Sequence, residues 1–407
     1  MPSNPYGWIQ KSLNTIHQAN WYRQVQPISG MAGPVVKMAG RSMVNLASND
    51  YLGLAGDSRL IEQAIAATKT YGTGATGSRL LSGHRELHRE LERVIAQLKG
   101  TEDAVVFSSG YLANIGTIAA LVGDRDSILT DEYNHSSLRN GATLSGATVI
   151  TYRHSDMADL AAKLSDHRTA YRRCLVLTDA VFGMDGDVCL LPEILELGDR
   201  FDAMVMIDEA HSAGVLGKTG AGCAEYFGYQ DQTRHHLTRH HSLMVQMGTL
   251  SKAFASLGGY VAGSADLIDF LRNRAPSWIY TTGLSPADTA AALGAIAVLK
   301  AEPERLTQLH QNVHYLSKRL DCLVRNLPNS EKQSLRRLPT DSAIVCLQVK
   351  DAATVLRLGS ALKAQGVFVS AVRPPTVPVS RLRMSVMATH TQAHLDQCVE
   401  ALTSVII

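Results

Sequence analysis

Seven short apolar runs, rich in β-branched residues, recur along the middle of the chain. Stretches with apolar residues at helical spacing separate them. Short buried strands that alternate with helices are typical of a parallel sheet covered on both faces, so we expect an α/β domain built on these runs. The predicted strands are residues 104–107, 127–130, 147–152, 174–182, 204–208, 243–248 and 259–263.

The last third of the chain predicts a smaller α+β domain. About forty positions after residue 285 carry apolar residues at helical spacing, interrupted around Pro303, which indicates two long helices. Strand-like runs follow at 342–349, 367–372 and 381–387, and a helix is expected near 391–405.

The beginning of the chain shows no steady periodicity and contains Pro5, Pro27 and Pro34. This pattern predicts an irregular arm with one helix near residues 8–24, and such an arm often packs on a partner. The predicted division of the chain is therefore an arm at 1–56, a large domain at 57–290 and a small domain at 291–407.

Composition narrows the possible partners. The chain has 407 residues, with 39 Lys and Arg against 37 Asp and Glu, so the formal net charge is 39 − 37 = +2. A balance this close to neutral argues against a nucleic-acid partner. With 45% hydrophobic and 19% charged residues, the composition is that of a globular protein and not of a disordered chain.

Targeting and cysteine signals point to the cytoplasm. The start of the chain has no basic segment followed by an apolar one, and no run reaches the ~18 apolar residues of a membrane span, so no membrane partner is expected. The cysteines form no Cys-x-x-Cys pair, which predicts reduced, mostly buried thiols and no metal site. They are Cys174, Cys189, Cys223, Cys322, Cys346 and Cys398.

Two motifs suggest functions that their surroundings do not support. Residues 72–77, GTGATG, match the pattern GxGxxG, but a helix-like segment precedes them, whereas a dinucleotide site needs a preceding strand. A glycine-rich active-site loop fits better. His235, His236, His240 and His241 lie in a polar connection, which we interpret as a surface turn and not as a metal site.

Residues that could carry chemistry follow several predicted strands. Asp208 ends one strand, His211 follows three positions later, and Lys252 lies on a turn after the next strand. Open parallel sheets bind ligands at the carboxyl ends of their strands, so these residues are expected to meet. Gly110, at a predicted helix start, offers backbone amides to an anion.

Each of these features has a plain alternative: a capping Asp with a packed His, a solvated lysine, and an ordinary strand-to-helix turn. Taken together, these features indicate a site for one cofactor. A carboxylate for a pyridinium nitrogen, a lysine for a Schiff base and a phosphate site describe pyridoxal 5′-phosphate as the cofactor.

At this level of detail the sequence resembles the α-oxoamine synthases, a family of fold type I pyridoxal phosphate enzymes. The resemblance runs from about residue 45 to residue 391 and rests on long motifs in a fixed order. Among them are ASNDYLGL, YGTGATGSRLLSGH, FSSGYLANIG, DEYNHSSLRNGATLSGA, IDEAHSAGVLGKTGAG, GTLSKAF and VRPPTVP. It implies a large domain with a mainly parallel seven-stranded sheet between helices, and a smaller α+β C-terminal domain.

The resemblance implies roles around the cofactor. Lys252 matches the lysine that bonds the cofactor aldehyde, and Asp208 the partner of the pyridine nitrogen. His211 matches a donor to the phenolic oxygen, and His135 the imidazole stacked over the pyridine ring. The implied phosphate contacts are Gly110, Tyr111 and Thr249, with Thr281 and Thr282 reaching the phosphate of a neighbouring subunit, so a homodimer with shared active sites is implied.

Substrate contacts are implied in the same way. Arg373 resembles the arginine that binds the amino-acid carboxylate, where a planar bidentate fork suits the chemistry. Asn49 and Thr376 resemble further substrate positions, and Arg23 an N-terminal arginine that meets a distal carboxylate of the acyl chain.

Two positions depart from the family pattern. Gly183 stands where a serine able to hydrogen-bond the cofactor is common, so one cofactor contact is expected to be missing. Gly283 also differs from the usual residue of its segment.

RPPTVP resembles the branch of the family that acts in biotin biosynthesis. That branch implies a decarboxylating condensation of L-alanine with a pimeloyl thioester of coenzyme A or acyl carrier protein. Alternatives are a sister synthase that uses glycine or serine with another acyl group, a simple aminotransferase, and a non-catalytic subunit that keeps the fold.

Overall fold

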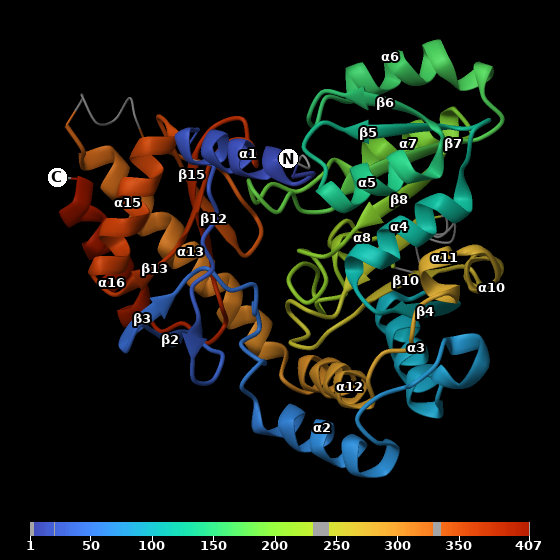
Figure 1. The fold of residues 1–407 in the computed structure, drawn as a ribbon, viewed down its shortest axis with the longest axis horizontal. Helices are drawn as coiled ribbons and strands as arrows, with labels where there is room; N and C mark the ends of the chain where they lie inside the picture. Colours follow the sequence, from blue (N-terminus) through green and yellow to red (C-terminus); the bar gives the residue numbers. More distant parts are fainter. Residues whose placement is uncertain (1–3, 20, 231–243, 329–334, 407) are drawn as a thin grey trace.

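A computed structural model describes residues 4–19, 21–230, 244–328 and 335–406. Figure 1 shows two lobes side by side: a larger one around a twisted sheet, and a smaller one that contains both the beginning and the end of the chain. Within the described ranges, none of the helices combines the length and the apolar character needed to cross a membrane.

Seven strands form the sheet of the larger lobe, and they confirm the seven predicted runs. They are β4 (Asp103–Phe107), β5 (Ser127–Asp131), β6 (Thr148–Tyr152), β7 (Cys174–Asp179), β8 (Met204–Asp208), β9 (Met244–Thr249) and β10 (Gly259–Gly263). Their order is β4-β10-β9-β8-β7-β5-β6. β10 is antiparallel to its neighbours β4 and β9, and the other pairings are parallel. The sheet is therefore mainly parallel, as expected.

Helices cover both faces of this sheet. The alternation of β7 shows why: Leu175 and Leu177 join one apolar cluster, whereas Cys174 and Val176 join another on the opposite face. The helices of this lobe are α2 (Ser58–Tyr71), α3 (Glu86–Lys99), α4 (Gly110–Leu121), α5 (Ser136–Ser145), α6 (Met157–His167), α7 (Leu191–Arg200), α8 (Cys223–Tyr226), α10 (Ala265–Arg274) and α11 (Pro276–Ile279), with the short turns η1 (Arg79–Gly83) and η2 (Arg168–Ala170).

Two long helices lead into the smaller lobe, as predicted. α12 (Pro286–Ala301) and α13 (Pro303–Asn326) are separated at Glu302, because Pro303 lacks the N–H that would continue the first helix. The antiparallel sheet of this lobe has the order β11-β12-β15-β14. Its elements are β11 (Leu335–Arg337), β12 (Ile344–Val349), α15 (Ala352–Ala364), β14 (Ser370–Val372), β15 (Arg381–Ser385) and α16 (Gln392–Ile406).

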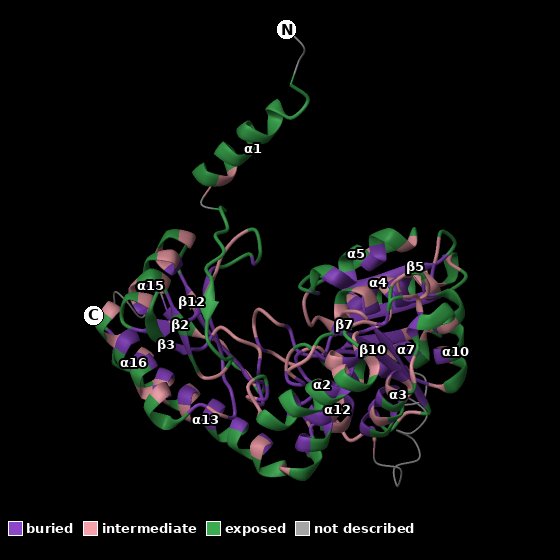
Figure 2. Cartoon of the chain, turned by 60° about the horizontal axis from the view of Figure 1, so that its bottom comes forward, coloured by how far each residue is buried: buried purple, intermediate pink, exposed green. Residues whose placement is uncertain are grey.

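The beginning of the chain is more regular than its sequence predicts. The expected helix is α1 (Gly7–Gln18), which buries no residue and projects from the smaller lobe (Figure 2). The strands β1 (Ile28–Ser29), β2 (Val35–Met38) and β3 (Arg41–Asn45) were not predicted; β3 pairs in parallel with β13 (Val367–Phe368). β1 has two residues, both exposed, and β2 and β3 have only four and five residues, which is too short for a clear alternation in the sequence.

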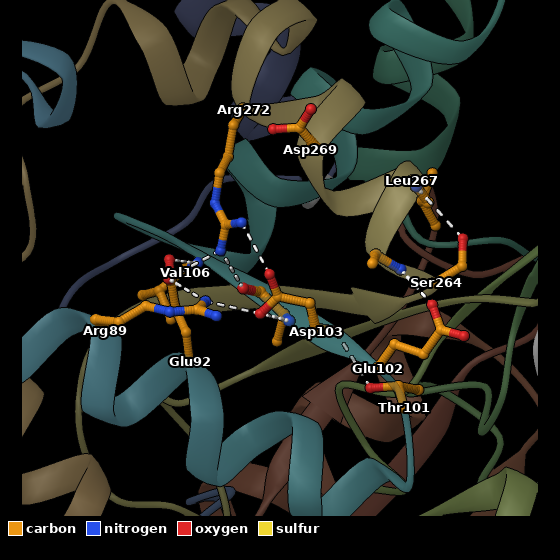
Figure 3. A network of polar contacts seen from close by, with 12 residues as sticks. Arg89, Glu92, Thr101, Glu102, Asp103, Val106, Ser264, Leu267, Asp269 and Arg272 are labelled. Atoms are coloured by element: carbon orange, nitrogen blue, oxygen red, sulfur yellow. Dashed lines mark hydrogen bonds and ion pairs between the residues drawn. The ribbon is translucent and has the colours of Figure 1, made fainter.

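A network of charged side chains ties α3 and α10 to the edge strand β4 (Figure 3). Arg272 donates to Asp103 Oδ2 at 2.8 Å and to Glu92 Oε2 at 3.0 Å, and Arg89 donates to Asp103 Oδ1 at 2.7 Å. Burial raises the pKa of Glu92, against the lowering effect of Arg272. The network therefore depends on the arginines to keep a buried carboxylate charged.

Replacement of Arg272 by alanine should destabilise this edge of the sheet. We expect R272A to lower the free energy of unfolding by about 2–3 kcal/mol, because Glu92 loses a cation while it stays buried. R274A, at the exposed end of the same helix, should stay within about 0.5 kcal/mol of the wild type. Urea denaturation of both variants measures the difference; equal losses would contradict the assignment.

Candidate active site

The carboxyl ends of β7, β8 and β9 bring the predicted chemistry to one edge of the sheet. Asp179 and Asp208 are register partners on the adjacent strands β7 and β8, and Asp208 pairs in turn with Met247 of β9. Thr249 ends β9, and Lys252 follows three residues later. Parallel pairing thus places two carboxylates beside the lysine turn.

Lys252 begins a chain of hydrogen bonds that crosses from the larger to the smaller lobe. Its Nζ lies 2.9 Å from His211 Nε2, and His211 Nδ1 lies 2.6 Å from Tyr51 Oη. Tyr51 Oη donates to Asn49 Oδ1 at 3.2 Å, and Arg383 Nη2 donates to the same oxygen at 3.0 Å. Lys252, His211 and Asn49, all singled out in the sequence, are therefore linked.

The pKa values indicate which group donates and which accepts in each of these hydrogen bonds. Burial lowers the pKa of His211 well below its usual value, so its ring is neutral, and burial raises that of Tyr51 to about 12. A protonated Lys252 donates to His211 Nε2, which leaves the ring proton on Nδ1 to donate to Tyr51. Each donor then meets an acceptor, ending at the amide oxygen of Asn49.

Lys252 itself is unlike a surface lysine. Its pKa is lowered to about 8, mainly by burial and also by the positive charge of Arg383, while the carboxylates of Asp208 and Asp179 oppose the shift. A lysine with such a pKa keeps a useful fraction of neutral, nucleophilic amine near neutral pH.

Asp208 is held as an acceptor on both oxygens. Asn114 Nδ2 donates to Oδ2 at 2.7 Å, and the backbone N–H of Ala210 donates to Oδ1 at 2.9 Å. Asn114 Nδ2 also donates to Ser137 Oγ at 2.8 Å, and this hydroxyl lies 2.6 Å from His135 Nδ1. His135 and Asp208, two predicted site residues, are thus connected through α4 and α5.

Asp179 is a second buried acid beside Asp208. Its Oδ2 accepts the backbone N–H of His135 at 2.6 Å. Burial raises the pKa of Asp179 well above its usual value, and the neighbouring charge of Asp208 adds to the rise. We assign the proton to Asp179 and the negative charge to Asp208, because like charges on adjacent strands disfavour double ionisation.

A cavity of about 470 Å³ opens in front of Lys252. It lies where the larger and smaller lobes meet, and Arg373 Nη2 on its wall donates to the backbone oxygen of Tyr22 at 2.9 Å. A second cavity of about 740 Å³ adjoins it and shares several lining residues. The predicted site residues on the first cavity are Arg23, Asn49, His135, His211, Lys252, Arg373 and Thr376.

Four of the five predicted phosphate contacts gather around the first turn of α4, and the side chain of the fifth, Tyr111, is exposed. Gly110 begins α4, and a Cβ there would lie 3.3 Å from the Thr249 side chain, so these two residues adjoin. Ser108 Oγ donates to the backbone oxygen of Thr282 at 3.0 Å. Tyr111 is exposed instead, with Oη accepting from Asn140 at 2.7 Å.

Buried Arg79 connects Thr281 to the first turn of α4. Arg79 donates to Thr281 Oγ1 at 3.2 Å and to Ser108 Oγ at 3.2 Å, so both threonines approach the α4 turn of their own chain. The role expected for them in a neighbouring subunit stays a prediction.

Four residues of the site escaped the sequence analysis: Tyr51, Asn114, Asp179 and Arg383. Asp179 follows a buried strand as Asp208 does, so its position carried the same signal. Tyr51 and Asn114 lie inside motifs already noted, but nothing in their spacing indicates which partner they reach. Arg383 lies on a strand of the smaller lobe, and only the tertiary structure brings it to Asn49.

The glycine-rich motif and the cysteines, which were not expected to bind a dinucleotide or a metal, can be located in the structure. Residues 72–77 follow the helix α2, without the strand that a dinucleotide site requires. The histidines from 235 to 241 lie outside the described residues. Five cysteines are buried and Cys322 is exposed, which confirms that most are buried; within the described ranges no group of three His, Cys, Asp or Glu suits a metal ion.

The residues present fit pyridoxal phosphate. Gly110 leaves the α4 N-terminus free of a side chain beside the Thr249 hydroxyl, which suits a phosphate. Asp208 is a fixed carboxylate with both oxygens already oriented, as a partner of a pyridinium nitrogen needs to be. Lys252 is the amine with a lowered pKa at the cavity floor.

Comparisons with known proteins agree with this chemistry. The family described as aminotransferase class I and II matches residues 41–402. A protein of Nostoc punctiforme named "Putative 8-amino-7-oxononanoate synthase" is 60% identical over 99% of this chain and 98% of its own length.

Solved structures give the same family. A serine palmitoyltransferase with pyridoxal phosphate has a TM-score of 0.88 at 27% identity, covering 98% of this chain and 97% of its own. The 8-amino-7-oxononanoate synthase of Francisella tularensis has a TM-score of 0.72 at 26% identity, covering 89% and 97%. The chain therefore belongs to the aminotransferase class I and II family and is a pyridoxal phosphate-dependent enzyme of fold type I.

Proposed function

We propose that this enzyme condenses L-alanine with a pimeloyl thioester to give 8-amino-7-oxononanoate, carbon dioxide and the free thiol of coenzyme A or acyl carrier protein, a step of biotin biosynthesis. In the overall reaction, the bond from Cα to the carboxylate breaks, a bond from Cα to the thioester carbonyl carbon forms, and the C–S bond of the thioester breaks, so that the sulfur leaves and takes up a proton. The main support is the 60% identity over nearly the full length to a relative named for this reaction.

The cavity in front of Lys252 supports the same substrates. Arg373 is suited to bind the carboxylate of L-alanine with its planar fork, and its hydrogen bond to Tyr22 orients the side chain. Arg23, whose Nη2 lies 3.4 Å from Thr376 Oγ1, supplies a second cation on the wall for a distal carboxylate. Arg373 and Arg23 would thus bind one carboxylate each, from the amino acid and from a dicarboxylic acyl group, in a cavity that Lys252 and Arg383 also line.

When bound, pyridoxal phosphate supplies an electron sink for the electrons released at the substrate Cα. Asp208 would keep a proton at the ring nitrogen, because Asn114 and the N–H of Ala210 hold its carboxylate in place. His135, the N-cap residue of α5, lines the cavity and would help to hold the ring. These residues orient the group without entering the bond changes themselves.

Lys252 is the proposed base and acid. Its pKa of about 8 leaves roughly a tenth of the amine neutral at pH 7, ready to take the proton from Cα and later return one to the same carbon. His211, neutral and fixed by Tyr51, accepts from the lysine ammonium and holds it toward the cavity.

We also propose a homodimer with active sites at the interface. Large apolar side chains are exposed close to the contact between Ser108 and Thr282: Leu81 is 87% exposed and Tyr280 82%. A second copy of the chain would bury this surface, and it would bring its own Thr281 and Thr282 to the phosphate turn.

A sister synthase is the second candidate. The TM-score is higher to a serine palmitoyltransferase (0.88) than to the Francisella enzyme (0.72), although the sequence identities are nearly equal. The two activities use different amino acids and different acyl groups, so the choice between them depends on how the cavity in front of Lys252 receives both substrates.

Gly183 matters because His211 occupies the space of a side chain at this position. A Cβ on residue 183 would lie 2.5 Å from His211 Nε2, the atom that faces Lys252. His211 cannot turn aside freely, since its other nitrogen is bound to buried Tyr51. Glycine therefore allows the contact between His211 and Lys252.

The pH dependence of cofactor attachment tests the state of Lys252. Only the neutral amine attacks an aldehyde, so the rate at which added pyridoxal phosphate binds covalently should rise with pH and level off above about 8, instead of continuing to the usual value near 10.5. Stopped-flow absorbance measures this rate, with K252A as the unreactive control. A rate still rising at pH 10 would show an ordinary lysine.

Adding a side chain at Gly183 should displace His211. We expect G183A and G183S to lower the free energy of unfolding by about 1–3 kcal/mol, as overpacking does, and to move the midpoint of the attachment profile to lower pH because the ammonium loses an acceptor. Gly123→Ala is the matched control, since its Cβ would meet no atom closer than 3.9 Å. A fully stable G183S with an unchanged midpoint would refute this account.

Carbon dioxide release decides between the proposed substrates. The enzyme loaded with pyridoxal phosphate should release it from L-alanine with pimeloyl-coenzyme A at least about tenfold faster than from glycine with acetyl-coenzyme A or serine with palmitoyl-coenzyme A. Trapping of radiolabelled carbon dioxide measures all three, and pimeloyl-acyl carrier protein is the second carrier. A preference for another pair would assign a sister activity, and pyridoxamine formation from L-alanine an aminotransferase.

A further inference from the structure

His154, a half-buried histidine outside the reaction described above, is bound between two carboxylates. Its Nδ1 lies 3.0 Å from Asp131 Oδ1, and its Nε2 lies 3.0 Å from Asp187 Oδ2. Burial alone would lower its pKa, but the two carboxylates raise it to about 10. The ring is therefore a cation that joins the end of β5 to the segment after β7.

The same ring packs against two aromatic side chains that line the active-site cavity. It stacks on Tyr133, with centroids 4.4 Å apart and planes at 18°, and it meets Phe182 edge to face at 4.5 Å. Tyr133 lines both cavities, and Phe182 lines the first. A charged ring attracts aromatic neighbours more strongly than a neutral one.

Asp131 extends this arrangement to the backbone. It accepts the N–H of Tyr133 at 2.8 Å and that of Ser155 at 2.9 Å, while its side chain is nearly inaccessible to solvent. The position of Tyr133 is thus fixed twice, by its backbone on Asp131 and by its ring on His154.

The turn at 182–187 is the other half of the wall. Met184 and Asp185 line both cavities, and Asp185 forms an ion pair with Arg381 of the smaller lobe. Asp187 ends the turn and contacts His154. His154 therefore contacts both parts of the wall that the two cavities share, Tyr133 and the turn at 182–187.

We propose that His154 is a positioning residue that holds Tyr133 and the 182–187 turn as the shared wall of the two cavities, and so determines how the acyl thioester binds. The identity of this ligand rests on the proposed function. The positioning itself rests only on the contacts of His154.

Three variants separate the parts of the contact. His154→Asn keeps a donor near Asp131 but loses Asp187 and the aromatic stack, and Tyr133→Leu removes the stacked ring with His154 intact. The double variant completes a cycle. His314→Asn, at an exposed histidine of α13, is the matched control.

Hydrogen exchange of the whole holoenzyme tests the positioning directly. In H154N, amides at residues 133, 155 and 182–187 should exchange at least about tenfold faster, whereas those of β8 and β9 should not change. H314N should behave as the wild type. Unchanged exchange at these amides would overturn the proposal, whatever reaction the enzyme catalyses.

Steady-state kinetics test the consequence for the substrate. H154N should raise the KM for pimeloyl-coenzyme A by roughly tenfold, while the KM for L-alanine should stay within about twofold of the wild type. In the Y133L background, H154N should change the KM for pimeloyl-coenzyme A by less than about twofold. Additive effects, or equal changes in both KM values, would overturn the proposal. A wild type that does not condense these substrates refutes the proposed function alone, and hydrogen exchange then decides the role of His154.

Discussion

Two acids on neighbouring strands impose the main constraint on this protein. Asp179 and Asp208 are register partners at the carboxyl edge of the sheet, and both are almost fully buried. Two negative charges cannot persist there, so one acid keeps its proton and the other stays ionised among hydrogen-bond donors. A cationic partner for Asp208 is then favoured in front of the sheet. The parallel pairing of β7 with β8 thereby prepares the site for a pyridinium ring.

The pKa of Lys252 is set by opposing effects of its surroundings. Burial and Arg383 favour its neutral amine, while the two acids favour the ammonium, and the balance leaves a pKa of about 8. The neutral ring of His211 adds an acceptor without adding charge. Lys252 can therefore act as nucleophile, base and acid within a narrow range of pH.

The sequence predicts those parts of the site that depend on local order. Buried runs followed by Asp208 and Lys252 mark strand ends, and parallel strands bring such ends together without further information. Tyr51 and Arg383 could not be assigned in this way, because their partners lie far away in the chain. The hairpin of β2 and β3 was missed for a related reason: its strands are short, and β3 also pairs with β13, which lies more than 300 residues later in the chain. The domain limits and the subunit contacts stay predictions.

The pairing of β3 with β13 also bears on how the chain folds during synthesis. The N–H of Val44 donates to the carbonyl oxygen of Gly366, and that of Leu46 to Phe368, so strand β3, already paired with β2, finds its parallel partner β13 only when nearly the whole polypeptide has left the ribosome. The larger lobe, whose strands all precede β11, can assemble before then. Asn49 and Tyr51 follow β3 directly, and their placement beside His211 waits on the same event. A chain that ends before residue 367 would lack both β13 and Arg383, so the hydrogen bond from Arg383 to Asn49 and the parallel partner of β3 become available only late in synthesis.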